Sequence, residues 1–277
     1  MRRVPAALCV LAPVVLLVLG WGPLVHGHPA HLVLLGVVVL VGIAAFRAPT
    51  WLAVVLAVVL IAPLVYLQPF GATDPPGDET VLRPPGEPKA GLVFHPGARV
   101  DYRAYLKLLD RVAQQGFLVV VVKEPLDIAL LGSDTADLRA EHPDVPVWAV
   151  GGHSLGGVAA AQEALSDNGI RGLVLWASYP VDDLSGRRDL TAWSIHGEKD
   201  GFTTPQDVAD SKKLLPADTR FEQVPGAVHA FFGDYGDQPG DGEPTVSRAE
   251  AQERIVALTA EALTAVATPS RGPSPSR

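Results

Sequence analysis

The chain has 277 residues, 48% of them hydrophobic, and a formal net charge of −8. This charge and the lack of any cluster of Lys and Arg exclude the basic face that a nucleic-acid partner requires. Cys9 is the sole cysteine, which excludes a disulfide framework or a thiolate metal site within one chain.

Three apolar runs, at 4–25, 31–46 and 50–67, occupy the start of the chain. A helix needs ~20 residues to cross ~30 Å of hydrocarbon, and each run is near that length. A cleaved signal peptide is the alternative for the first run, but its apolar stretch is long and no small-x-small cleavage site follows it. Residues 1–67 are therefore predicted to form three transmembrane helices, which makes the lipid bilayer a partner.

The arginines of this region predict its orientation. Arg2 and Arg3 precede the first run, and Arg47 lies between the second and third. The loop between the first and second runs contains His26, His28 and His31 but no Lys or Arg. Short loops rich in Lys and Arg stay in the cytoplasm. Three spans with the amino terminus inside predict a multi-pass protein of the cell membrane whose remaining domain lies outside the cytoplasm. The histidine loop is interpreted as an interfacial connection, not a metal site.

The composition changes after the third run. Residues 68–90 carry six prolines among acids and glycines, a pattern typical of an extended linker. Residues 91–268 have the pattern of an α/β domain, and the Pro/Ser-rich tail 269–277 is predicted to be disordered.

Short apolar runs alternate with amphipathic segments in the region 91–268. The expected strands are 91–94, 117–122, 147–150, 172–177, 192–195 and 221–224. Helices are expected at 101–114, from Pro205 to about 215, and after Ser247, which forms an S-x-x-E capping box with Glu250. This alternation predicts a doubly wound, mostly parallel sheet, whose ligands bind at the carboxyl ends of the strands.

Residues 152–156, in GGHSLGG, fit the G-x-S-x-G pattern of a nucleophile elbow. In such an elbow the serine occupies a strained turn between a strand and a helix, and glycines stand where side chains would collide with backbone. Ser154 is therefore the candidate nucleophile.

A serine nucleophile needs a base and an orienting acid, which in this architecture follow it in the order acid, then histidine. His229 lies in a loop after the last strand, whereas His196, the other downstream histidine, lies at a strand end. Asp200 is the leading candidate for the acid. Glu198, Asp182 and Asp183 remain weaker alternatives.

Five stretches, FHPGARVDYRAY, VVVVKEP, GGHSLGG, IHGEKDGFTTP and GAVHAFFGDYG, resemble the α/β-hydrolase superfamily. The resemblance covers about 91–268 and is to the small lidless branch, similar to dienelactone hydrolases and carboxylesterase-like proteins. It implies an α/β-hydrolase fold, with the triad Ser154, Asp200 and His229. It also implies an oxyanion hole made by the N–H of Leu155 and that of Ala98 or Gly97, with His95 positioning that loop. Dienelactone enzymes use cysteine where this chain has Ser154, so their specialised chemistry is not expected here.

The expected function is hydrolysis of small or short-acyl carboxylic esters through an acyl-enzyme. Only 46 positions separate Ser154 from Asp200 (200 − 154), which leaves no room for a lid domain. No cofactor fingerprint is present, and the acidic segment 234–243 lacks the ligand spacing of a calcium loop, so neither metal nor cofactor is expected. The alternatives are a catalytically silent binding or sensor domain, and an acyltransferase with the same triad.

Overall fold

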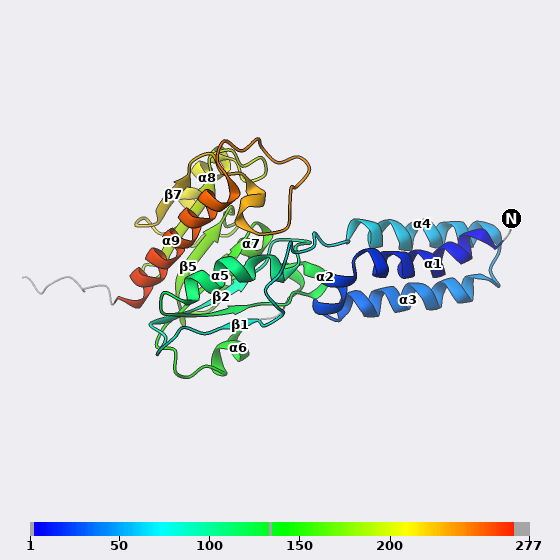
Figure 1. Cartoon of the computed structure of the whole chain (residues 1–277), viewed down its shortest axis with the longest axis horizontal. Coiled ribbons are helices and arrows are strands. Elements are labelled where there is room, and N and C mark those ends of the chain that lie inside the picture. The colour runs from blue at the N-terminus through cyan, green and yellow to red at the C-terminus, as the bar shows by residue number, and fades with distance from the viewer. Residues whose placement is uncertain (1–2, 133–134, 269–277) are drawn as a thin grey trace, which may run out of the picture.

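The computed structural model describes residues 3–132 and 135–268. It has an elongated shape, with a bundle of amino-terminal helices at one end and an α/β domain at the other (Figure 1). Arg2 and the tail 269–277, for which disorder is predicted, lie outside the described residues.

Each of the three apolar runs forms a helix of the bundle. These are α1 (Val4–Leu19), α3 (Ala30–Ala45) and α4 (Thr50–Tyr66), and the short α2 (Trp21–His26) follows α1. Small residues allow the helices to pack closely, as at Gly42 of α3, where an added Cβ would lie 2.7 Å from the Cβ of Cys9 on α1.

The expectation of three transmembrane helices is not met by these lengths. The three helices contain 16, 16 and 17 residues, and no helix in the described part of the chain is both long and apolar enough to cross a membrane. The first run is divided at Gly20, which separates α1 from α2. Placement of the α/β domain outside the cytoplasm stays a prediction.

The α/β domain is built on a seven-stranded sheet in the order β1-β3-β2-β4-β5-β6-β7. All neighbouring strands are parallel except β1 and β3. The strands are β1 (Val81–Leu82), β2 (Ala90–His95), β3 (Phe117–Val121), β4 (Trp148–His153), β5 (Ile170–Trp176), β6 (Thr191–Gly197) and β7 (Arg220–Val224). All six expected strands are confirmed, and the doubly wound, mostly parallel sheet with them.

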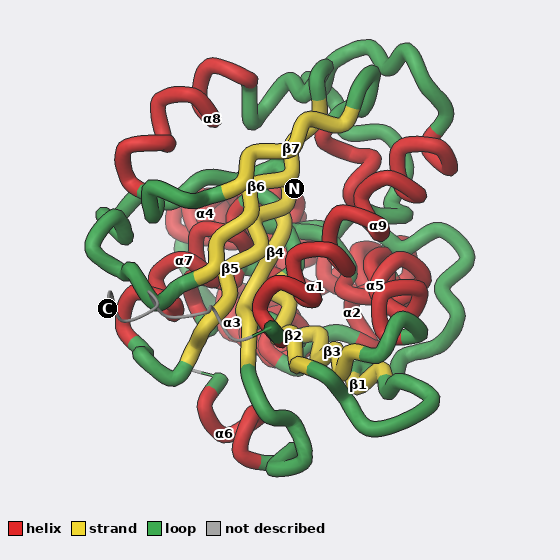
Figure 2. Tube along the Cα trace, turned by 90° about the vertical axis from the view of Figure 1, so that its left-hand side faces the viewer, coloured by secondary structure: helices red, strands yellow, loops and turns green. Residues whose placement is uncertain are grey.

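Helices cover both faces of the sheet (Figure 2). α5 (Leu106–Ala113) and α9 (Arg248–Ala267) pack on one face, and α7 (Leu155–Ser166) packs on the other. Strand β2 contributes to the hydrophobic core on each face of the sheet, because Leu92 and Phe94 pack on the face of α5 and α9 and Val93 packs on the face of α7. Burial on both faces explains why the strands are continuous apolar runs.

The expected helices form with small differences. The segment after Asp101 begins as a 3₁₀ turn at Tyr102–Tyr105 before α5. α8 (Pro205–Ser211) is capped by Thr204, and the Ser247 side chain accepts from the N–H of Glu250 at the start of α9, as expected.

Two segments differ from the sequence analysis. The predicted linker is not only a spacer, since its residues Val81–Leu82 form strand β1 at the sheet edge and Phe70 forms an isolated bridge with Val100. Between β3 and β4 the chain also forms short 3₁₀ turns at Pro125–Asp127 and Ala129–Leu131, and α6 (Ala136–Ala140). The turn at Pro125–Asp127 follows the carboxyl end of β3, whereas α6 lies near the amino end of β5, since its Arg139 pairs with Asp167.

Candidate active site

Ser154 lies between β4 and α7 with backbone angles of φ 53° and ψ −123°. A non-glycine residue rarely adopts a positive φ, and such strain persists only when the surroundings impose it. Its N–H donates to the carbonyl of Trp176 (3.0 Å), and its own carbonyl accepts from the Ser178 hydroxyl (2.7 Å). Both sides of the turn are thus fixed by the strand β5 and the loop after it.

The two glycines of the motif are required by close backbone contacts. A Cβ on Gly152 would lie 2.4 Å from the backbone carbon of Gly156, and a Cβ on Gly156 would lie 2.1 Å from the His95 carbonyl oxygen. Backbone atoms have no alternative rotamer that relieves such overlaps. The steric explanation of the motif is confirmed.

Asp200 and His229 are brought together from two loops at the carboxyl edge of the sheet. His229 Nδ1 lies 2.9 Å from Oδ2 and 3.1 Å from Oδ1 of Asp200, and both residues are buried. Asp200 Oδ1 also accepts from the N–H groups of Phe202 (2.8 Å) and Thr203 (2.7 Å). A carboxylate held in this way keeps the histidine proton on Nδ1, which leaves Nε2 as a base.

His229 lies beside the nucleophile turn. Its ring centroid is 4.4 Å from that of His153, the residue before Ser154. No hydrogen bond joins Ser154 Oγ to His229 in the part of the chain that the structure describes. Nucleophile–base hydrogen bonds often tighten only when substrate binds.

The alternative acids and base occupy other environments. Glu198 is partly exposed, pairs with Lys199 (3.0 Å) and accepts from the N–H of Gly226 (2.9 Å). Burial lowers the pKa of His196, whose Nδ1 has no partner among the described residues. Asp182 and Asp183 are exposed and bind Gln162 and the N–H of Ser185, respectively. Within residues 3–132 and 135–268, no hydrogen bond or ion pair joins any of these four to Ser154 or His229.

In the loop after β2, the hydrogen bonds distinguish the two candidate oxyanion donors, Gly97 and Ala98. The N–H of Gly97 donates to the Tyr105 hydroxyl (3.0 Å), so Gly97 is not available as a donor. Among the described residues, no hydrogen bond occupies the N–H of Ala98 or that of Leu155. Ala98 and Leu155 are therefore the candidate pair.

Tyr105, which the sequence analysis did not single out, links this loop to the nucleophile turn. Its hydroxyl accepts from Gly97 and lies 2.9 Å from His153 Nδ1. Burial and the neighbouring His229 hold the pKa of His153 well below its usual value, so the ring is neutral. In the tautomer with its proton on Nε2, the neutral ring accepts the Tyr105 hydroxyl proton at Nδ1. No sequence motif indicates this contact, because Tyr105 is simply an apolar-face residue of its helix.

His95 lies behind the same loop, between two carboxylates. Its Nδ1 is 2.7 Å from Glu124 and its Nε2 is 3.2 Å from Glu163. Burial lowers the pKa of His95, but the hydrogen bonds and charges of Glu124 and Glu163 outweigh burial and raise it to about 9. The protonated ring joins β2 to α7, consistent with the expected role of His95 in positioning the loop.

Asp241, from the acidic segment 234–243, joins the acid loop to the base loop. Its Oδ1 accepts from the N–H groups of Gly201 (3.1 Å), His229 (3.2 Å) and Gly242 (2.7 Å), and its Oδ2 accepts from that of Ala230 (2.8 Å). No group of three or more His, Cys, Asp or Glu arranged to hold a metal ion occurs within residues 3–132 and 135–268. The aspartate is thus a backbone anchor for the loops that carry Asp200 and His229.

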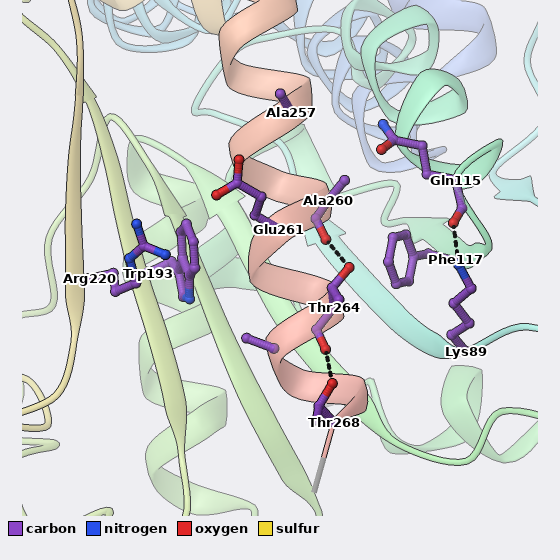
Figure 3. Close-up of a pocket in the computed structure, with 11 residues that line it drawn as sticks. Lys89, Gln115, Phe117, Trp193, Arg220, Ala257, Ala260, Glu261, Thr264 and Thr268 are labelled. Carbon is purple, nitrogen blue, oxygen red and sulfur yellow. Dashed lines mark hydrogen bonds between the residues drawn. The ribbon is translucent and has the colours of Figure 1, made fainter. Parts of the chain in front are cut away.

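A groove of about 850 Å³ lies far from these residues, between α9 and the amino ends of several strands (Figure 3). Lys89, Phe117 and Arg220, which line it, stand at or just before the first residues of β2, β3 and β7. Ser154, Asp200 and His229 instead follow the last residues of their strands. The groove is therefore at the opposite edge of the sheet and contains no candidate catalytic residue.

The α/β domain is similar to known proteins. Residues 91–253, more than half of the chain, match a family described as "Alpha/beta hydrolase family". No curated protein sequence matches the chain. Among solved structures, the chain is similar to DcsB in complex with its substrate analogue, with 12% identity, a TM-score of 0.50, and coverage of 67% of this chain and 93% of that one.

Two further solved structures are similar. For Est1E from Butyrivibrio proteoclasticus the identity is 13%, the TM-score 0.47, and the coverage 66% of this chain and 93% of that one. For the esterase domain of a Rhodothermus marinus protein the identity is 14%, the TM-score 0.44, and the coverage 65% and 91%. At 12% identity, the likeness to DcsB is one of fold alone.

Proposed function

Because this chain belongs to the alpha/beta hydrolase family, we propose that it is a serine hydrolase that cleaves carboxylic esters. The observation that carries the proposal is the buried Asp200–His229 pair beside Ser154, whose backbone has the strained geometry of a nucleophile elbow. A binding module has no use for a strained serine, a base and an orienting acid at one sheet edge.

The proposed reaction uses these residues in two half-reactions. Ser154 Oγ attacks the acyl carbonyl while His229 Nε2 takes its proton and then returns it to the leaving alcohol. Asp200 holds the imidazole tautomer and stabilises the imidazolium. The N–H groups of Ala98 and Leu155 receive the oxyanion, each worth ~3–4 kcal/mol in the transition state. Water activated by His229 then cleaves the acyl-enzyme, a route that requires neither metal nor cofactor.

The proposed substrates are small or short-acyl esters. Between Ser154 and Asp200 the chain forms only α7, β5 and β6, with their connecting loops. A long acyl chain is usually enclosed by helices inserted after the nucleophile, and none is present in this span. A preference for long-chain triglycerides over short esters would contradict the proposal.

The test compares the full chain with three variants on p-nitrophenyl esters of increasing chain length. We expect Ser154→Ala to abolish hydrolysis and Asp200→Asn to reduce it by ~10⁴, as wrong-tautomer variants of such triads do. Glu198→Gln is the matched control, since it removes a nearby loop carboxylate that does not contact His229, and it should retain activity. Hydrolysis that survives in Ser154→Ala would refute the nucleophile assignment.

Two alternatives give different outcomes in the same samples. A silent binding or sensor domain would leave Ser154 unlabelled by a fluorophosphonate probe, whereas the proposed enzyme is labelled and Ser154→Ala is not. An acyltransferase would form an ester product when an alcohol is added as acceptor, at the expense of the free acid. Product analysis therefore separates hydrolysis from transfer.

We also propose that the helical bundle contacts a lipid bilayer. Most of the large exposed apolar side chains belong to it, and Arg47 is the only Lys, Arg, Asp or Glu from Val4 to Tyr66. Acyl chains match such a surface because they offer no polar groups that need partners. The full chain should co-sediment with phosphatidylcholine vesicles and resist extraction by carbonate. A soluble, monodisperse chain in detergent-free buffer would contradict the proposal.

A further inference from the structure

The residue after the candidate oxyanion donor, Arg99, is held by the segment that leaves helix α4. Its N–H donates to the carbonyl of Asp127 (2.7 Å), and its carbonyl accepts from the N–H of Phe70 (2.6 Å). The N–H of Asp101 donates back to the Phe70 carbonyl (3.0 Å). Residue 70 therefore pairs with the oxyanion loop on both sides of Val100, as a short parallel bridge.

The backbone of Arg99 has a φ of 60°. An arginine pays a steric cost for this conformation, so its neighbours must impose it. Gly97, two residues earlier, is fixed independently by Tyr105. Ala98 thus lies between two anchored residues, and its N–H, free of any partner among the described residues, is the one backbone donor of this loop left to face the site.

The Arg99 side chain adds a second attachment to the bundle. Its guanidinium carbon lies 4.5 Å from the ring centroid of Tyr66, the last residue of α4, and 5.3 Å from that of Phe70. One of its nitrogens donates to the Gln68 carbonyl (3.4 Å). Guanidinium groups stack well on aromatic rings, so the end of α4 and the following segment hold the Arg99 side chain by these contacts.

Helix α3 reaches the same loop from another side. His31, in its first turn, places Nε2 3.8 Å from Oδ2 of Asp127, the residue whose carbonyl receives the Arg99 N–H. Both side chains are buried. Arg99 therefore contacts α4 directly, through Tyr66, and is linked to α3 through Asp127 and His31.

We propose that the amino-terminal helical bundle sets the direction of the Ala98 N–H through Arg99. Arg99, Tyr66 and Phe70 are then positioning residues for the oxyanion hole; this inference rests on the proposed serine hydrolysis. Release of Arg99 allows the peptide planes on either side of Ala98 to rotate, which tilts its N–H away from the oxyanion. Because the oxyanion exists only in the transition state, kcat should fall while KM changes little.

The experiment uses the full chain, p-nitrophenyl acetate and a trifluoromethyl ketone, which forms a tetrahedral adduct with the serine. Arg99→Gly is the first variant, because glycine accepts the positive φ and lacks the side chain that contacts Tyr66 and Phe70. Tyr66→Ala removes one of the stacked rings, and Tyr66→Phe is the conservative variant that keeps it. Val65→Ala is the control, since Val65 is the exposed neighbour of Tyr66 on α4.

We expect kcat to fall ~10-fold in Arg99→Gly and Tyr66→Ala, less than the ~10²–10³ lost when an oxyanion donor is removed outright. KM should stay within about twofold, and the ketone should bind weaker by the same factor as kcat/KM falls. Tyr66→Phe and Val65→Ala should match the wild type. Thermal unfolding, measured for every variant, confirms that each is folded.

The possible results distinguish failure of the positioning role from failure of the proposed function. Unchanged kcat and ketone affinity in Arg99→Gly, or a rise in KM alone, would overturn the positioning role while the wild type remains an esterase. An equal loss in Tyr66→Phe would overturn the stacking argument. A wild type that hydrolyses no ester and is not labelled by a fluorophosphonate would instead overturn the proposed function, and this inference with it.

Discussion

Replacement of Asp241 tests the claim that one carboxylate fixes both catalytic loops. In Asp241→Asn, one oxygen becomes an amide nitrogen and meets a backbone N–H. If the nitrogen replaces Oδ2, the contact with Ala230 is lost, and if it replaces Oδ1, those with Gly201, His229 and Gly242 are lost. The first orientation loses one hydrogen bond instead of three, so we expect the asparagine side chain to adopt it.

The magnitude follows from the number and type of bonds. A hydrogen bond to a charged group contributes ~1.5–3 kcal/mol, and the bonds that remain lose their charge assistance. Asp241 is only partly buried, so water replaces some of what is lost. We therefore expect Asp241→Asn to lower the free energy of unfolding by ~2 kcal/mol and Asp241→Ala by ~3–4 kcal/mol.

The effect on activity should exceed the effect on stability. Both the N–H of His229 and that of the next residue are held by Asp241, and a misplacement of about 1 Å can cost ~10²-fold in rate. The assay is kcat/KM on p-nitrophenyl acetate together with guanidinium unfolding. Asp237→Asn is the control, because Asp237 lies in the same loop with a fully exposed side chain. Equal behaviour of Asp241→Asn and Asp237→Asn would refute the reasoning.

Three further predictions concern stability. Gly156→Ala should lower the free energy of unfolding, measured in urea, by at least ~3 kcal/mol, since its Cβ would overlap the backbone oxygens of His95 and Pro96. Gly36→Ala in α3 is the control and should be neutral or stabilising, because an added Cβ there meets nothing within 4 Å. The pKa of His95 is about 9 in the folded protein, against a usual 6.5. The protonated ring should therefore stabilise the fold fully below pH 6.5, and this stabilisation should be lost as the pH rises through about 9. The loss is on the order of 3 kcal/mol, and it should be missing when the unfolding of His95→Gln is measured between pH 6 and 10. Burial, then the charges of Asp101 and Glu124, raise the pKa of Asp127 from 3.8 to about 8. Stability should therefore decline between about pH 4 and 8, where the carboxyl is ionised in the unfolded chain but protonated in the folded one. Asp127→Asn should flatten that decline in calorimetry and be more stable than the wild type above pH 8, and a decline of unchanged slope would contradict the assignment.

The sequence alone determines the features that depend on local pattern. The six strands are visible because both faces of a parallel sheet are apolar. Ser154, Asp200 and His229 can be proposed from their order and from their positions after strands, since the carboxyl ends of parallel strands meet at one edge. Gly152 is predictable from the motif, because the backbone that its Cβ would overlap lies within five residues of chain, whereas Gly156 is required by the backbone of His95 and Pro96.

Only the tertiary structure decides which distant groups meet. Asp241 has no spacing that marks it as an anchor for His229, and Tyr105 and Arg99 acquire their roles from contacts with His153 and with Tyr66. The choice between Gly97 and Ala98 likewise depends on whether a tyrosine hydroxyl from another segment reaches one N–H. The runs 31–46 and 50–67 predict the bounds of α3 and α4 to within one residue, but the run 4–25 does not predict the division at Gly20, which depends on backbone conformation and not on hydropathy. Hydropathy and periodicity report the surroundings of each residue along the chain, whereas a hydrogen bond between loops depends on how the whole sheet aligns them.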